Sequence, residues 1–171
     1  MNQAFKKANI YTHGFQLLET KNLKKLNIFK RALSSYLNDK YSLQETEPDI
    51  ILNKIHLLAN IKSDKDANEL VLDIIKKFAD KYDFAEIAFD CFTKEIIELL
   101  GPDLHSQRNN NIVFQYPNSN RYSELHTDSP PNSPYEIVFW IPLVNCYDSK
   151  SFFVIPKADS KNLIEDYRIN K

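Results

Sequence analysis

Residues 118–147 read NSNRYSELHTDSPPNSPYEIVFWIPLVNCY, and this stretch decides the predicted fold of the second half of the chain. β-Branched and aromatic residues cluster there in short runs separated by Pro, Asn and Ser, a pattern typical of strands joined by turns. The predicted strands are residues 111–116, 122–128, 135–144 and 151–155. The sequence after Gly101 therefore indicates β structure.

The first half of the chain has a helical pattern instead. Apolar residues recur at the three- and four-residue spacing of a buried helix face in four successive segments. Start and stop signals accompany them: Thr46-Glu-Pro-Asp49, the capping box Ser63-Asp-Lys-Asp66 and the ending pair Gly101-Pro102. The predicted helices run from Thr20 to about Tyr41, through residues 47–61, through 63–78 and from Asp83 to Leu99, after a short opening strand at residues 14–18.

Composition narrows the classes of function. The 171 residues suit one domain, predicted as a mainly helical part at 1–101, a β part at 102–157 and a tail at 158–171. A net charge of −1 with dispersed Lys and Arg gives no sign of a nucleic-acid partner. Without an apolar run of about 20 residues or a signal peptide, a cytoplasmic protein with no membrane partner is expected. Two glycines in the whole chain exclude glycine-rich phosphate loops.

His126 and Asp128 are the candidate metal ligands. Alternate residues of a strand point to the same side, so the two side chains are predicted to start roughly 6.6 Å apart on one face. Two histidines and a carboxylate on one face of an octahedron are the usual ligands of non-haem iron in oxygenases. The spacing alone is common, and without its context a surface histidine beside an Asp is the more frequent explanation. Cys91 and Cys146 lack metal-ligand spacing and are predicted to be buried thiols.

The context of this pair resembles the central segment of the phytanoyl-CoA dioxygenase-like group of 2-oxoglutarate oxygenases. In that group a His-x-Asp strand end is followed by a loop, by an apolar strand with a Trp that ends in Pro-Leu, and by a strand ending in Ile-Pro. The corresponding parts here are Trp140 with Pro142-Leu143, and Ile155-Pro156. Residues 11–18 are similar to the group's opening strand, and the run before His126 is similar to oxygenase-like proteins of carbohydrate biosynthesis clusters.

The resemblance implies a fold and a set of roles. The fold would be α+β, with the N-terminal helices packed on a partial double-stranded β-helix, or jelly roll. His126 and Asp128 would bind Fe(II), while Trp140 and Gln115 would contact the cosubstrate 2-oxoglutarate. Trp140 is expected to face inward with Val138 and Glu136; it could equally be an ordinary core indole. Gln115 could instead bond a backbone group.

The sequence also departs from the group. After Asp128 there is no further histidine, whereas the group supplies a distal His and then an Arg or Lys for 2-oxoglutarate, a role that no motif assigns to Arg168. The second half of the barrel is expected to be missing, as in a truncated or split member. Open strand edges would then favour self-association or completion by another chain. Arg121 and Tyr122 could meet a polar substrate or be solvated.

Two functions follow from these patterns. The first is a non-haem Fe(II)/2-oxoglutarate-dependent oxygenase of hydroxylase type that acts on a small-molecule or carbohydrate-type substrate. The second is a non-catalytic remnant or interaction module that lacks the distal His and the anchoring Arg. A cupin-like metal isomerase ranks last, because no motif supports it.

Overall fold

The chain divides into two compact units in a computed structural model that describes residues 9–20, 22–107, 111–119, 126, 137–148 and 150–169. The first, called the helical unit, comprises Thr20–Tyr122 and Phe139–Asn145. The second, called the terminal unit, comprises Met1–Glu19, Ser123–Val138 and Cys146–Lys171. Each unit is built around helices, which make up more than half of the residues that the structure describes.

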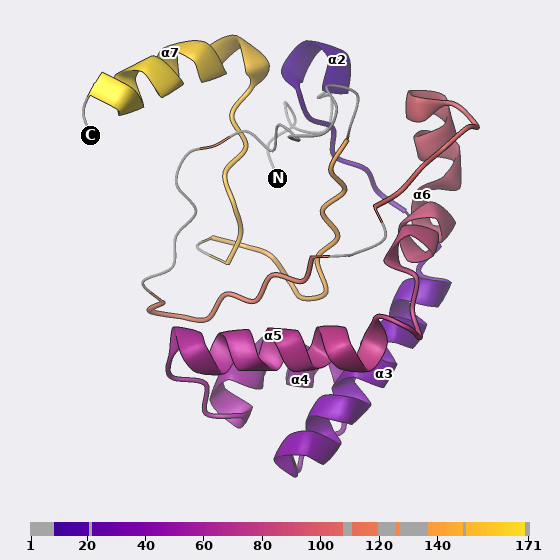
Figure 1. Ribbon diagram of the computed structural model, residues 1–171, viewed down its shortest axis with the longest axis vertical. Helices are drawn as coiled ribbons and strands as arrows, with labels where there is room; N and C mark the ends of the chain where they lie inside the picture. Colours follow the sequence, from indigo (N-terminus) through magenta and orange to yellow (C-terminus); the bar gives the residue numbers. More distant parts are fainter. Residues whose placement is uncertain are drawn as a thin grey trace. The chain divides into compact units, whose positions relative to one another are not determined.

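Among the described residues of the helical unit there are four helices (Figure 1). They are α3 (Lys24–Tyr41), α4 (Pro48–Leu58), α5 (Asp64–Phe78) and α6 (Phe84–Leu100). Helix α3 contacts both α4 and α6, and each helix turns an apolar stripe inward, as the periodicity predicts. The buried apolar side chains that form this core cluster are Leu26, Phe29, Leu33, Leu37, Ile51, Leu52, Ile55, Ile61, Ala67, Leu70, Ile74, Phe78, Ile87 and Cys91.

Phe29 on α3 lies at the centre of this core. Its side chain is fully buried, and its ring centroid lies 5.8 Å from that of Phe78, 5.2 Å from that of Tyr82 and 4.8 Å from that of Phe84. All three pairs are edge-to-face, the arrangement that the aromatic quadrupole favours. Phe29 therefore joins α3 to the end of α5 and the beginning of α6.

The helix boundaries follow local capping chemistry. Pro48 occupies the first turn of α4 after Glu47, which makes no side-chain capping bond. The capping box predicted for α5 is confirmed: Ser63 accepts from the N–H of Asp66 at 3.1 Å, and Asp66 accepts from the N–H of Ser63 at 3.1 Å. Helix α6 ends at Gly101, whose φ of 82° suits glycine.

Helix α6 has a kink at Phe92, where φ is −136° and ψ is 32°. The carbonyl groups of Asp90 and Cys91, just before the kink, accept hydrogen bonds from side chains outside the helix. Asn22 donates to Asp90 at 2.7 Å, and the Thr20 hydroxyl donates to Cys91. Backbone groups near a break in the helical ladder need such partners. The segment before α3 is thereby attached to α6.

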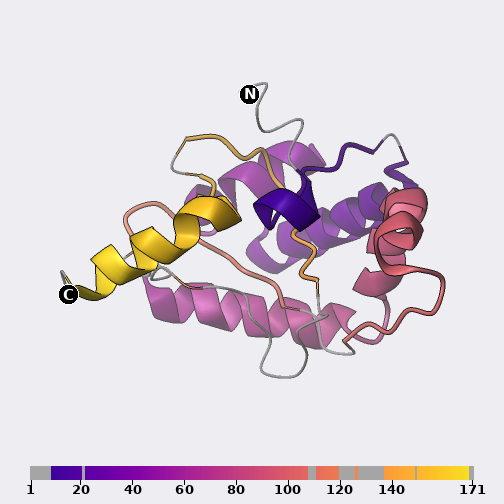
Figure 2. The same ribbon diagram turned by 90° about the horizontal axis from the view of Figure 1, so that it is seen from above.

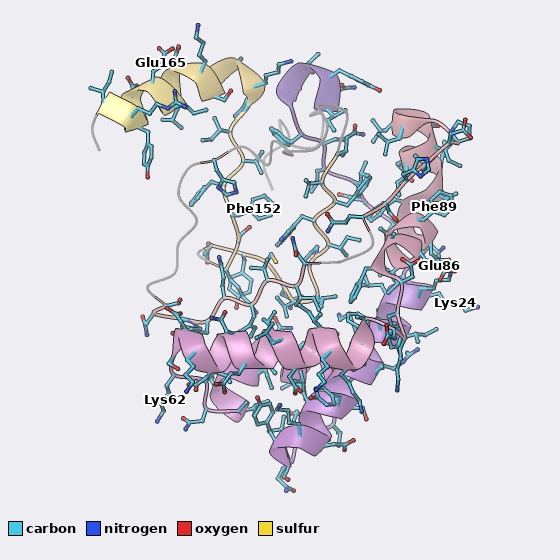
Figure 3. All side chains as sticks on the ribbon, in the orientation of Figure 1. Lys24, Lys62, Glu86, Phe89, Phe152 and Glu165 are labelled. Atoms are coloured by element: carbon cyan, nitrogen blue, oxygen red, sulfur yellow. The ribbon has the colours of Figure 1, made fainter. Side chains whose placement is uncertain are left out.

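Two polar contacts connect the helices at the surface. Lys25 of α3 forms an ion pair of 2.6 Å with Glu86 of α6, and Figure 3 shows Glu86 beside the start of α3, where Lys24 is labelled. Lys40 and Tyr36 of α3 both donate to the carboxylate of Asp73 on α5. The hydrogen bond from Lys40, followed by that from Tyr36, lowers the pKa of Asp73.

The terminal unit contains α2 (Ile10–His13) and α7 (Lys157–Ile169), and both views show the beginning of α7 beside α2 (Figures 1 and 2). Gly14 ends α2 with a φ of 81°, and a Cβ on it would lie 3.4 Å from the Cβ of Lys157. Residues 14–18 form no strand, so the predicted opening strand is wrong. No helix of the described residues is long and apolar enough to cross a bilayer.

The predicted α+β fold with a partial jelly roll, or double-stranded β-helix, is wrong for the described part of the chain, which contains helices and no strand. Residues 111–116, the described part of 135–144 and residues 151–155 are all outside regular structure. Of the predicted strand at 122–128, only His126 belongs to the described residues. The physical reason is that a strand needs a hydrogen-bonded neighbour, whereas β-branched and aromatic composition supplies only a preference for extended backbone.

Candidate functional site

Of the two predicted metal ligands, the structure describes only one, His126. His126 belongs to the terminal unit and is exposed to solvent. Asp128 lies outside the described residues, as do Arg121, Tyr122 and Glu136. An exposed imidazole can be reached by a metal ion from solution, and imidazole with carboxylate is a donor set that suits Fe(II).

Gln115 belongs to a segment, residues 111–119, in which every second side chain faces the helices. Ile112, Phe114 and Tyr116 are half-buried and pack against the core, while Val113 and Gln115 between them are exposed. This two-residue alternation is the pattern of an extended chain with one covered face. In Figure 1 the segment runs alongside α5, and its last residues lie beside the first residues of that helix. Gln115 therefore faces away from the helical core.

Trp140 belongs to the second such segment, residues 139–145 of the helical unit. Ile141 and Leu143 are half-buried against the core, whereas the Trp140 side chain is 50% exposed. The indole is therefore no ordinary core side chain. Gln115 and Trp140 both lie on faces of their segments that the helices leave uncovered.

Hydrogen bonds from the helices hold each segment. At the start of α5, a single oxygen of Asp64 accepts from the Tyr116 hydroxyl at 3.1 Å and from the Ser119 hydroxyl at 2.8 Å. Burial, followed by the hydrogen bond to Asp64, raises the pKa of Tyr116. On α4, the side-chain oxygen of Asn53 accepts from the backbone N–H of Asn145 at 3.1 Å. We call Asp64 and Asn53 the two anchors.

The anchors are absent from the sequence-based predictions. Asp64 stands next to Ser63, where the pattern indicates only a helix start, and Asn53 lies on a helix face without a motif. Their partners are 52, 55 and 92 residues away. A single sequence holds no local signal that links residues so far apart.

The other histidines supply no third metal ligand in the described part of the chain. His13 caps the turn of α2, where its Nδ1 accepts from the backbone N–H of Asn9 at 3.2 Å. His56 is half-buried on α4, and His105 follows α6. Among the residues that the structure describes, no three His, Cys, Asp or Glu side chains are grouped as a metal ion requires. An iron site complete within those residues is therefore not present.

The cysteines differ in environment. Cys91 is buried in the core, and this burial raises the pKa of its thiol, as expected for an inert side chain. Cys146 is exposed, so the prediction of two buried thiols is wrong for that residue.

Comparisons with known proteins give no relative. No family model matches the chain, and neither a curated protein nor a solved structure is significantly similar to it.

Proposed function

We propose that the chain is a non-haem Fe(II)/2-oxoglutarate-dependent oxygenase that acts on a small-molecule or carbohydrate-type substrate. The observation that carries the proposal is the order of chemical groups along the sequence: His126-x-Asp128, then an apolar run with Trp140 and Pro142-Leu143, then Ile155-Pro156. The side chain of Trp140 is half exposed, which leaves its indole accessible to a ligand.

Each residue has a defined part in this proposal. His126 would supply a neutral imidazole and Asp128 a carboxylate to Fe(II), leaving coordination positions for a third ligand and for 2-oxoglutarate. When bound, Fe(II) with 2-oxoglutarate would supply oxygenase chemistry in which O2 is the oxidant: one oxygen atom hydroxylates a substrate C–H bond and the other enters succinate as 2-oxoglutarate loses CO2. The indole of Trp140 would offer an apolar wall, and the amide of Gln115 would offer the two N–H donors of its NH2 group and a carbonyl acceptor to the cosubstrate.

A non-catalytic interaction module is the second candidate. It is favoured by the exposed apolar side chains on the segments at 111–119 and 139–145, among them Val113 and Trp140, while the helices have a well-buried core of their own. This candidate predicts that Fe(II) and 2-oxoglutarate have no effect on the protein.

The oxygenase proposal is tested by 2-oxoglutarate decarboxylation. Purified chain with Fe(II), ascorbate and oxygen should convert 2-oxoglutarate to succinate, because many oxygenases of this chemistry turn over slowly without their substrate. The variants His126→Ala and Asp128→Ala should abolish succinate formation. His105→Ala is the matched control, since this exposed histidine has no motif around it. Equal succinate formation by all four proteins, or none by the unaltered chain, would favour the non-catalytic module.

A further inference from the structure

The backbone of residues 111–116 has no hydrogen-bonded neighbour. Within the described part of the chain, the N–H and C=O groups of Ile112, Val113, Phe114 and Gln115 make no hydrogen bond to the protein. The side chains alternate between the helical core and solvent, and that of Val113 is 73% exposed. In a β-sheet the backbone groups of such a segment would bond a neighbouring strand. The segment therefore resembles a strand edge that lacks its neighbour.

The sequence of this segment does nothing to block a strand from adding to it. Proteins commonly protect a strand edge with charged side chains or proline. Residues 111–119 contain no Asp, Glu, Lys, Arg or His, and their single proline, Pro117, follows the extended part. Residues 112–114, Ile-Val-Phe, are of types that favour strands. Because proline has no N–H to donate, Pro117 limits a pairing to residues 111–116.

The absence of charge favours a second copy of the same segment as the occupant. Antiparallel pairing about a two-fold axis brings the central side chains of a segment next to their own counterparts. A charged residue near the centre would face a like charge, which destabilises a cross-strand pair. Residues 111–116 avoid that repulsion, whereas a charged partner strand would find no complementary charge on them. Two copies would satisfy their open backbone groups together.

Two registers keep the core-facing side chains of both copies on one face, because opposite residues of an antiparallel pair point to the same face. In the first register, Val113 lies opposite Val113 of the second copy, and Ile112 lies opposite Phe114. In the second, Phe114 lies opposite its own counterpart, and Val113 lies opposite Gln115. Both registers place the two Val113 side chains on the outer face, either directly opposite or about 7–8 Å apart on the diagonal.

We infer that residues 111–116 pair as an antiparallel strand with the same residues of a second copy of this chain. The dimer is weak, because about five residue pairs bury far less than the roughly 1,000 Å² that a stable interface needs. The outer face of the segment stays exposed in the pair. The inference is therefore independent of the proposed function.

Sedimentation velocity over a series of concentrations up to several hundred micromolar tests the pairing. The unaltered chain should change from monomer to dimer. Val113→Lys should weaken the dimer roughly tenfold, because two lysines then repel each other across the strands. Leu57→Lys is the matched control: Leu57 is 68% exposed on α4, so the same charge at a similar exposure should leave the dimer unaffected.

Charge complementation separates strand pairing from other effects of the substitution. A mixture of Val113→Lys and Val113→Glu should restore the dimer that each variant alone has lost, because opposite charges then meet across the strands. Hydrogen exchange at residues 112–115 of the unaltered chain should slow as its concentration rises, since paired N–H groups are protected. Circular dichroism checks that each variant is folded.

Three results would overturn the inference. A chain that is monomeric at every concentration would exclude the second copy and leave the edge to a strand from a different protein. Equal weakening by Val113→Lys and Leu57→Lys would show that the contact is not specific to the segment. A dimer that forms without slower exchange at residues 112–115 would show that the contact lies elsewhere on the surface.

Discussion

Replacing Phe29 with alanine should destabilise the helical unit severely. The ring is fully buried and makes edge-to-face contacts with Phe78, Tyr82 and Phe84 at centroid distances between 4.8 and 5.8 Å. Truncating such a side chain costs roughly 3–5 kcal/mol, because it removes transfer free energy and leaves a cavity. Since a domain of this size has a total stability of about 5–15 kcal/mol, roughly a fifth or more of it would be lost.

Urea unfolding followed by far-ultraviolet circular dichroism measures this loss, and Phe89→Ala is the matched control. Phe89 lies on α6, where its side chain is 37% exposed (Figure 3). Its truncation removes less buried area and gains helix propensity, so it should cost about 1 kcal/mol. Equal losses of stability for the two variants would show that Phe29 is not at the centre of the core. A loss below about 1.5 kcal/mol for Phe29→Ala would show the same.

Two further predictions concern surface and segment contacts. The hydrogen bond from Lys40 is the main cause that lowers the pKa of Asp73 from its ordinary value of 3.8. The contribution of the Asp73 carboxylate to folding stability is therefore present above pH 3.8 and is lost as the pH falls through the lowered pKa of the folded state. The side chains of Lys40 and Asp73 are both about one-third exposed, so Asp73→Asn should lower the free energy of unfolding by less than about 1 kcal/mol near pH 7. Near pH 2 the substitution should have almost no effect, and a stability difference that grows in acid would contradict this prediction. Phe114→Ala should cost about 2 kcal/mol in urea unfolding and Val113→Ala under about 0.5, since only Phe114 faces the core; the reverse order would show that the segment has the opposite register.

The four long helices could be predicted because their signals are local. The apolar stripe of α5 and its capping box at Ser63 and Asp66 lie within one segment, and the same residues are buried and bonded in the structure. The kink at Phe92 could not be predicted, because the side chains that bond the carbonyls beside it come from Thr20 and Asn22.

In the described part of the chain the strands were predicted wrongly, because strand formation depends on partners distant in sequence. Residues 112–116 have one covered and one exposed face, yet the covered face packs on helices and not on a neighbouring strand. The same limit applies to the site. Trp140 was expected to face inward with Val138, yet both side chains are about half exposed, and the contact between Asp64 and Tyr116 spans 52 residues and has no sequence signature.

Binding of Mn(II) at His126 is the most direct test of the proposed function. Mn(II) substitutes for Fe(II) at sites of oxygen and nitrogen ligands, and its electron paramagnetic resonance signal broadens on binding. Titration in the presence of 2-oxoglutarate should show one Mn(II) bound per chain, with His105→Ala unchanged and His126→Ala binding none. Absence of binding by the unaltered chain, or equal binding by His126→Ala, would contradict the assignment of His126 as a metal ligand.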